Sequence, residues 1–194
     1  MLRDRYFAWR EEVPGYRFTH RWTDWEQIAP AAKLAVVAAE DQKFASHSGF
    51  DLESIGDALE QRKRGRSTRG ASTITQQVAK NLFLWPGQSW PRKGIEAWFT
   101  ILIEGIWPKQ RILEVYLNVA EFGHGTFGIG AAAERYFHKS AADLEPWEAA
   151  RLAAVLPNPK RLSAARPSSY VLERQRWIQG QMHQLGADGW LENP

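Results

Sequence analysis

Apolar residues recur every three or four positions along most of this chain, which is the period of an amphipathic α-helix. The pattern begins after Pro30, a residue that favours the first helical turn, and predicts a helix that ends at Glu40. A later helix is expected to begin at Ser72, whose hydroxyl can cap the first turn. The apolar stripes of these two helices are Leu34, Val37 and Ala38 in the first and Ile74, Val78 and Leu82 in the second.

Four more helices follow from the same period. The first spans about Arg92 to Ile106, and the next two begin near Pro108 and Pro146, the latter ending before Pro157. The last runs from about Ser168 to Gly186, a residue suited to ending a helix. The side chains expected to point inward are Ile95, Trp98, Phe99, Leu102 and Ile106 in the first, Ile112, Val115, Tyr116 and Val119 in the second, and Ala150, Ala153 and Ala154 in the third.

Strand signals are weak, and the only period-2 alternation lies near Tyr16–Trp22, where a short hairpin is expected. Two loops stand out between the helices. The segment Gln61–Gly70 is strongly cationic, and Glu121–Gly130 holds four glycines, which indicate tight turns. The chain is therefore predicted to be mainly α and to form a single domain over residues 1–194.

Composition narrows the class of protein without naming a function. The net charge of +3 suits phosphate-bearing partners in general and does not single out nucleic acid. Ten tryptophans suggest a membrane interface, a sugar or a partner surface, although most tryptophans simply pack in a core. The absence of cysteine excludes disulfide scaffolds and thiolate metal sites. No run approaches the roughly 18–20 apolar residues of a membrane span, so no anchor is expected within this chain.

Glu40 and Asp41 stand at the end of an otherwise apolar helix. A carboxylate at that edge is partly desolvated, which raises its pKa and suits a general base. The alternative is an ordinary solvated acid at a helix end. His47, nearby, is expected to have a structural role, because no His/Asp/Glu cluster has the spacing of a transition-metal site.

The segment from Gly70 to Asn81 combines amides, hydroxyls and one ammonium at the start of a helix. Gln76 and Lys80 share a face at i, i+4, an arrangement that suits anionic oxygens, although an exposed polar face would look the same. Further along, Glu96 lies one turn after Arg92, so a salt bridge is its natural alternative role. Glu114 and Asn118 form another i, i+4 pair, for which a structural network between helices is the stronger interpretation.

Taken in order, these segments resemble the conserved motifs of the family 51 glycosyltransferases, the peptidoglycan transglycosylases. The resemblance covers roughly residues 20–170, and no transpeptidase domain follows, as in the monofunctional members. The matching segments are Glu-Asp-Gln-Lys-Phe-Ala-Ser-His-Ser-Gly-Phe-Asp (40–51), Gly-Ala-Ser-Thr-Ile-Thr-Gln-Gln-Val-Ala-Lys-Asn-Leu-Phe (70–83), Arg-Lys-Gly-Ile-Glu (92–96), Arg-Ile-Leu-Glu-Val-Tyr-Leu-Asn (111–118) and Glu148–Pro159.

The resemblance implies a lysozyme-like, bilobal helical domain whose smaller hydrophobic lobe faces the membrane. It implies that Glu40 is the catalytic base and that Glu96 is a second catalytic carboxylate. The residues expected to contact substrate are Asp41, Phe44, His47, Gly70, Ser72, Thr73, Gln76, Gln77, Lys80, Asn81, Arg92, Lys93, Glu114 and Asn118.

The same resemblance implies the reaction and its surroundings. The substrates are lipid II and the undecaprenyl-diphosphate-linked glycan, at the periplasmic face of the bacterial inner membrane. No residue is assigned as a metal ligand, but a divalent cation (Mg or Mn) at the donor diphosphate and other cell-wall synthases as partners are expected. Nucleic acid is not expected. The competing hypotheses are a lysozyme-like lytic transglycosylase or hydrolase, and a non-catalytic scaffold at the membrane.

Members of the family often carry an arginine where this chain has Gln88, between the second and third motifs. Glutamine keeps hydrogen bonding but loses the positive charge that helps to hold a diphosphate. Gln88→Arg should therefore strengthen substrate binding, which a titration with the lipid-linked substrate would measure. An unchanged apparent affinity would show that neighbouring basic residues already supply the charge.

Overall fold

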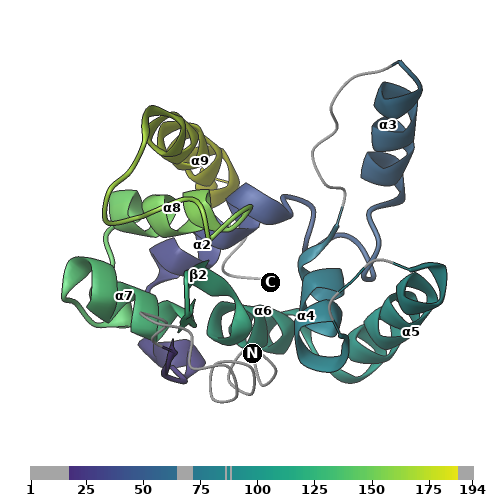
Figure 1. Cartoon of the computed structure of the whole chain (residues 1–194), viewed down its shortest axis with the longest axis horizontal. Coiled ribbons are helices and arrows are strands. Elements are labelled where there is room, and N and C mark those ends of the chain that lie inside the picture. Colours follow the sequence, from purple (N-terminus) through teal and green to yellow (C-terminus); the bar gives the residue numbers. More distant parts are fainter. Residues whose placement is uncertain (1–17, 65–71, 86, 88, 188–194) are drawn as a thin grey trace.

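The computed structural model describes residues 18–64, 72–85, 87 and 89–187, and over these residues the chain is mainly α-helical, as predicted (Figure 1). One group of helices, α2, α8 and α9, packs together as the larger lobe, with α7 beside it. These helices span Pro30–Glu40 (α2), Pro146–Val155 (α8), Ser169–Ala187 (α9) and Ile129–Phe137 (α7), with short 3-10 helices at Trp25–Gln27 (η1) and Ala141–Asp143 (η2). The predicted limits of α2 and α8 are confirmed.

The smaller lobe is built on α4 (Ile74–Phe83), which packs against both α5 (Trp90–Ile106) and α6 (Lys109–Val119). Helix α3 (Leu52–Lys63) rises from the body beside this lobe (Figure 1). No periodicity predicted α3, and its last turn contains residues 61–63, which were expected in a loop. The rest of the expected cationic loop, from residue 65 to Gly70, lies outside the described residues.

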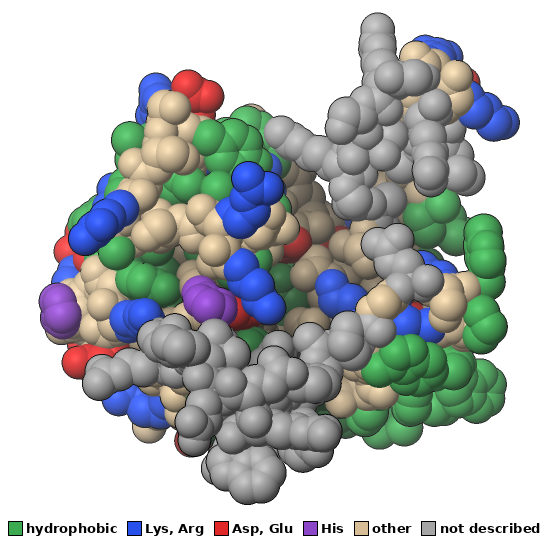
Figure 2. Space-filling view, viewed as in Figure 1, with side chains coloured by type: hydrophobic (Ala, Val, Ile, Leu, Met, Phe, Trp, Pro, Cys, Tyr) green, Lys and Arg blue, Asp and Glu red, His purple; other side chains and the backbone are tan. Residues whose placement is uncertain are grey.

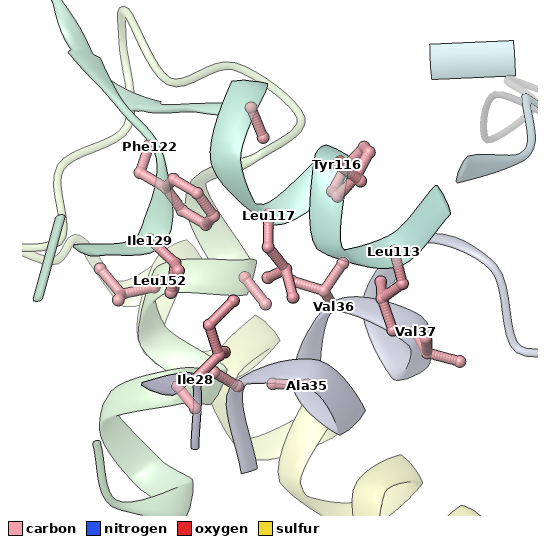
Figure 3. Packing of buried hydrophobic residues seen from close by; sticks show 14 of the residues in the cluster. Ile28, Ala35, Val36, Val37, Leu113, Tyr116, Leu117, Phe122, Ile129 and Leu152 are labelled. Carbon is pink, nitrogen blue, oxygen red and sulfur yellow. The ribbon is translucent and has the colours of Figure 1, made fainter. Parts of the chain in front are cut away.

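A single hydrophobic core joins the two lobes, because α6 contacts α2 on one side and α4 on the other. Val36 and Val37 of α2 meet Leu113 and Leu117 of α6 in its centre (Figure 3). Fully burying such a side chain stabilises a fold by about 1.5–3 kcal/mol. The four residues expected to be buried on α6 and the three on α8 are all buried, which confirms both stripes.

The strands form a small sheet of order β1-β3-β2. Strands β2 (Glu121–Gly123) and β3 (Thr126–Phe127) pair antiparallel around Gly125, whose φ of 76° is the left-handed conformation that glycine allows. Strand β1 (Thr19–His20) pairs in parallel with β3, so the hairpin expected within residues 16–22 is wrong. Its partner lies about a hundred residues away, which local alternation cannot reveal.

Helix α4 begins one residue later than predicted, with Thr73 rather than Ser72 as its N-cap. The Thr73 hydroxyl accepts the Gln76 N–H at 3.2 Å, and the Gln76 side-chain oxygen accepts the Thr73 N–H at 3.0 Å. This reciprocal pair is a capping box. The prediction of Ser72 as the N-cap overlooked the bond that Gln76 makes back to Thr73. At the other end of the chain, α9 continues through Gly186 to Ala187, so Gly186 does not end that helix.

Helix α5 buries a different face from the one predicted, rotated by about 100° (one residue) around the helix axis. Trp98 and Ile106, expected to point inward, are 60% and 72% exposed, whereas Glu96, Thr100 and Ile103 are buried. The other expected inward residues are exposed (Ile95, Leu102) or half-buried (Phe99). Figure 2 shows hydrophobic side chains gathered over this end of the smaller lobe. Among the described residues, no helix is long and apolar enough to cross a membrane.

Glu114 and Asn118 on α6 hold the segment that precedes α2. The Asn118 amide accepts the Thr23 N–H at 2.7 Å and donates to the Thr23 carbonyl at 2.9 Å, and Glu114 accepts the Trp25 N–H at 2.9 Å. Asn118 is fully buried, and Glu114 also pairs with Arg111. These contacts form a structural network between elements, which confirms the stronger interpretation of this pair from the sequence.

Asn118→Ala should lower the free energy of unfolding by about 3 kcal/mol, because it removes both bonds to Thr23 and leaves buried backbone groups unpaired. Chemical denaturation monitored by circular dichroism measures the loss. Gln110→Ala, an exposed position on the same helix, is the matched control and should change little. An Asn118→Ala protein as stable as its control would show that the network contributes nothing.

Candidate active site

A cleft of about 660 Å³ opens between the two lobes. Its floor is the end of α2, one wall is α4, and the other wall is the end of α8 with the first turns of α9. Figure 2 shows a hollow in this face, with basic side chains around it and acidic ones within it. The polar and aromatic residues that line it are Glu40, Asp41, Gln42, Lys43, Asp51, Ser54, Ser72, Thr73, Gln77, Lys80, Tyr170, Arg174 and Trp177.

Glu40 is the last residue of α2, so its carboxylate enters the cleft from the floor. Burial raises the pKa of the Glu40 carboxyl above its ordinary value, against the opposing effect of a hydrogen bond from Gln77. The Gln77 amide donates to Glu40 at 2.9 Å. A raised pKa in a half-buried carboxylate is the property expected of a general base.

Tyr116 of α6 sets the orientation of the Gln77 amide. Its hydroxyl is fully buried and donates to the Gln77 side-chain oxygen at 3.1 Å. Burial raises the pKa of Tyr116 well above the ordinary tyrosine value, so the hydroxyl keeps its proton. With its oxygen held by Tyr116, the Gln77 amide turns its NH₂ group toward Glu40.

Charges on both walls act on Glu40. Arg174 and Lys80 lower its pKa, and Asp41 raises it. The Lys80 side chain is exposed to the cleft. Partial burial of its ammonium lowers the pKa of Lys80, while the carboxylates of Glu96 and Glu40 raise it. The single ammonium of the α4 wall therefore lies within the field of both candidate catalytic carboxylates.

Asp41 fixes the end of α2 against the start of α4. Its carboxylate accepts the Ile74 N–H at 2.9 Å and a hydrogen bond from His47 Nε2 at 2.9 Å. His47 Nδ1 in turn accepts the Gly49 N–H at 3.1 Å, so Nε2 carries the proton given to Asp41. Phe44 is fully buried beneath this turn. Asp41, His47 and Phe44 therefore hold the walls of the cleft in place, and of the three only Asp41 lines it.

Glu96 lies behind the α4 wall on α5. It is buried, pairs with the Lys93 ammonium and lies 3.7 Å from the Arg92 guanidinium. Arg92 also donates to the Trp85 carbonyl at 2.8 Å. The salt bridge expected as the alternative role is therefore present, and it gathers two cations on the same side of the cleft as Lys80.

The remaining sequence-predicted residues divide into three groups. Ser72, Thr73, Gln77 and Lys80 line the cleft together with Glu40 and Asp41. Gln76 is buried in the capping box, Asn81 is half-buried on α4, and Glu114 and Asn118 hold the segment before α2. Gly70 and Gln88 lie outside the described residues.

Comparison with known protein families supports the candidate active site described above. A family model described as "Transglycosylase" matches residues 10–183. The chain belongs to this family.

Proteins named biosynthetic peptidoglycan transglycosylase are similar to the chain over most of its length. That of Xanthomonas campestris pv. campestris is 57% identical over 187 residues, which is 96% of this chain and 76% of the relative. That of Shewanella oneidensis is 56% identical, covering 93% of this chain and 80% of the relative. That of Chromohalobacter salexigens is 53% identical, covering 99% and 82%.

Sequence reasoning missed the α9 wall of this transglycosylase cleft. Tyr170, Arg174 and Trp177 line the cleft, but they lie at or beyond the end of the motif-bearing region. The available signal was their spacing, i, i+4 and i+7, which places three large side chains on one face of a helix.

Gln77→Leu should raise the pKa of Glu40 further, because the hydrogen bond that it removes stabilises the charged carboxylate. Titration of the Glu40 carboxyl carbon by NMR measures the shift. Gln42→Leu is the control, since Gln42 also lines the cleft but bonds to the Ala38 carbonyl and Gln181. If the pKa of Glu40 stayed unchanged or fell in Gln77→Leu, the assigned hydrogen bond would be wrong.

Proposed function

We propose that this transglycosylase polymerises peptidoglycan glycan strands from lipid II, with Glu40 as the general base. The observation that carries the proposal is the half-buried Glu40 carboxylate, of raised pKa, in a cleft whose α4 wall bears Lys80. The names of the similar proteins support peptidoglycan as the polymer that is made, and a cell-envelope location follows from that polymer.

In the proposed reaction Glu40 accepts the proton of the 4-hydroxyl on the acceptor's N-acetylglucosamine. The freed oxygen attacks C1 of the donor's N-acetylmuramic acid, the bond from C1 to the diphosphate oxygen breaks, and undecaprenyl diphosphate leaves with that electron pair. The new β-1,4 bond forms with inversion, because the base and the leaving group lie on opposite faces of the donor sugar. Gln77 keeps the Glu40 carboxylate oriented toward the hydroxyl.

The leaving diphosphate needs neutralisation of charge more than a proton. Lys80 supplies one positive charge at the cleft, and Arg92 and Lys93 add two more around Glu96. Glu96 holds these cations in place, which is the role we assign to the second carboxylate. At the start of α4 the N–H groups of Thr73 and Ile74 are already bound, so Ser72, whose hydroxyl makes only a long bond of 3.4 Å to Gln76, is the further donor to anionic oxygens.

The residues of this side do not fit a resident divalent cation. Within the described part of the chain, no three His, Cys, Asp or Glu side chains gather into a possible metal site. Glu96, the nearest candidate, already pairs with Arg92 and Lys93. We therefore assign neutralisation of the leaving diphosphate to the basic side chains. A Mg or Mn ion would have to be bound by the oxygens of the diphosphate itself.

The exposed face of α5 supports a peripheral position on the membrane that carries lipid II, at the periplasmic side of the inner membrane. Its apolar side chains join those at the end of α4 and the segment after it, and tryptophan suits the lipid–water interface. The exposed residues are Phe83, Trp85, Trp90, Ile95, Trp98, Ile101, Leu102 and Ile106. Arg92 and Lys93, the cations around Glu96, also lie on α5, where they would meet the diphosphate of a membrane-bound lipid substrate. Other cell-wall synthases remain proposed partners, with no surface assigned to them.

Glu40→Gln should reduce polymerisation of purified lipid II at least about 100-fold, because a general base contributes that much or more. Gel analysis of the glycan product measures the loss. Glu134→Gln, an exposed acid on α7, is the matched control and should polymerise normally. Equal product from Glu40→Gln and its control would refute the assignment of the base, and shortening of added glycan strands by the wild type would point to a lytic enzyme.

A protein with Trp90, Trp98 and Ile106 all changed to serine should bind phosphatidylglycerol vesicles at least about tenfold more weakly, since each change removes apolar surface from the bilayer. Vesicle co-sedimentation measures binding, and wild-type tryptophan fluorescence should shift to the blue when vesicles are added. Trp147→Ser, an exposed tryptophan on α8, is the control. Equal binding by the triple variant and the wild type would place the membrane surface elsewhere.

A further inference from the structure

An ion pair outside the cleft holds the loop that follows Glu40. Glu104 lies on the last turn of α5 and Lys109 is the first residue of α6, so the pair spans the corner between these helices. The Lys109 ammonium donates to the Glu104 carboxylate at 2.8 Å. Their side chains are only 16% and 11% exposed, so solvent weakens this pair less than a surface pair. Neither residue lines the cleft or belongs to the segments that resemble the family motifs.

Both residues also contact the loop itself. The Lys109 ammonium donates to the His47 carbonyl at 2.5 Å. Glu104 packs beside Gly49, where a Cβ would lie 3.0 Å from the Glu104 side chain and 2.7 Å from that of Thr100 on the same helix. With a φ of 85°, Gly49 has the left-handed conformation that glycine allows, and its lack of a side chain lets the loop approach α5 this closely.

The same contacts reach the residues around the proposed base. His47 Nε2 donates at 2.9 Å to Asp41, which directly follows Glu40. Glu104 extends the support to α4, because it accepts a hydrogen bond from the Thr75 hydroxyl at 2.5 Å. The ion pair therefore connects the corner of α5 and α6 both to the helix end that bears the proposed base and to the helix that faces it.

We propose that Glu104 and Lys109 are positioning residues for the transfer reaction, which hold the loop after Glu40 so that its carboxylate stays aligned with the acceptor hydroxyl. This inference rests on the proposed function and deepens it, because neither residue touches substrate in this role. Alignment has a large effect on rate, since a displacement of about 1 Å can cost about 100-fold.

A positioning role predicts a loss of kcat rather than of substrate binding. Lys109→Met keeps most of the length of the side chain but removes its charge and its hydrogen bonds to Glu104 and the His47 carbonyl. For polymerisation of purified lipid II, kcat should fall about tenfold while KM stays within about twofold, because the residues proposed to bind substrate are unchanged.

The acid limb of the kcat–pH profile separates positioning from a general loss of stability. Burial is the largest cause of the raised pKa of Glu40. A loop that no longer holds the carboxylate in place should expose it to water, so the acid limb should move toward lower pH in Lys109→Met. The other charged groups that act on Glu40, which are Asp41, Lys80 and Arg174, stay the same in every variant. So does Tyr116, whose buried hydroxyl keeps its proton.

Matched variants complete the test, with circular dichroism to establish that each is folded at the assay temperature. Lys109→Arg keeps a cation that can donate to both acceptors, so it should restore most of kcat and the wild-type acid limb. Thr75→Val is a milder change, which removes one hydrogen bond of the network and should act in the same direction as Lys109→Met. Lys139→Met is the control, because Lys139 pairs with Glu145 and Glu148 in the larger lobe, outside the cleft lining, and should leave kcat and the acid limb unchanged.

An unchanged kcat in Lys109→Met and Thr75→Val, or a fall in kcat that leaves the acid limb in place, would overturn the positioning role. The same shift of the acid limb in Lys139→Met would overturn it as well. In each case polymerisation by the wild type, and its loss in Glu40→Gln, would leave the proposed function intact. Failure of the wild type to polymerise lipid II, or full activity of Glu40→Gln, would instead overturn the proposed function, and the positioning role with it.

Discussion

The contact on which the site most depends is made by the Asp41 carboxylate. By accepting the Ile74 N–H and the His47 hydrogen bond, it ties the end of α2 in the larger lobe to the start of α4 in the smaller one. Glu40, one residue earlier, is thereby directed at Gln77, on the second turn of α4. A buried, hydrogen-bonded carboxylate at this junction costs stability if one partner is lost, so the junction resists small displacements.

Burial at the same junction gives Glu40 its chemistry. Helix α2 packs against α8 and α9, and its end lies beside Gln77 of α4, so Glu40 is largely buried and the pKa of its carboxyl is raised. In the proposed function, basic groups of α4 and α5 neutralise the leaving diphosphate on one side of the cleft, opposite the aromatic row of α9, Tyr170 and Trp177. In the same proposal, the exposed apolar face of α5 rests on the membrane, so that a lipid-linked diphosphate would reach these cations at the membrane surface.

Much of this could be predicted from the sequence, because helical periodicity and short motifs are local. The stripes of α2, α6 and α8 depend on three- to four-residue spacing and were predicted correctly. Helix α5 was predicted with the wrong face inward, since a hydrophobic stripe has the same pattern whether it is buried or exposed. Strand β1 and the α9 wall depend on partners far along the chain, which no local pattern specifies.

The central claim is that a carboxylate of raised pKa, Glu40, removes the acceptor's proton. The pH dependence of kcat for lipid II polymerisation tests this claim most directly. Activity should fall toward acid with an apparent pKa above the ordinary glutamate value, because the base must be ionised and burial makes ionisation harder. A rate that stayed constant as the pH fell through and below the ordinary glutamate pKa would contradict the account.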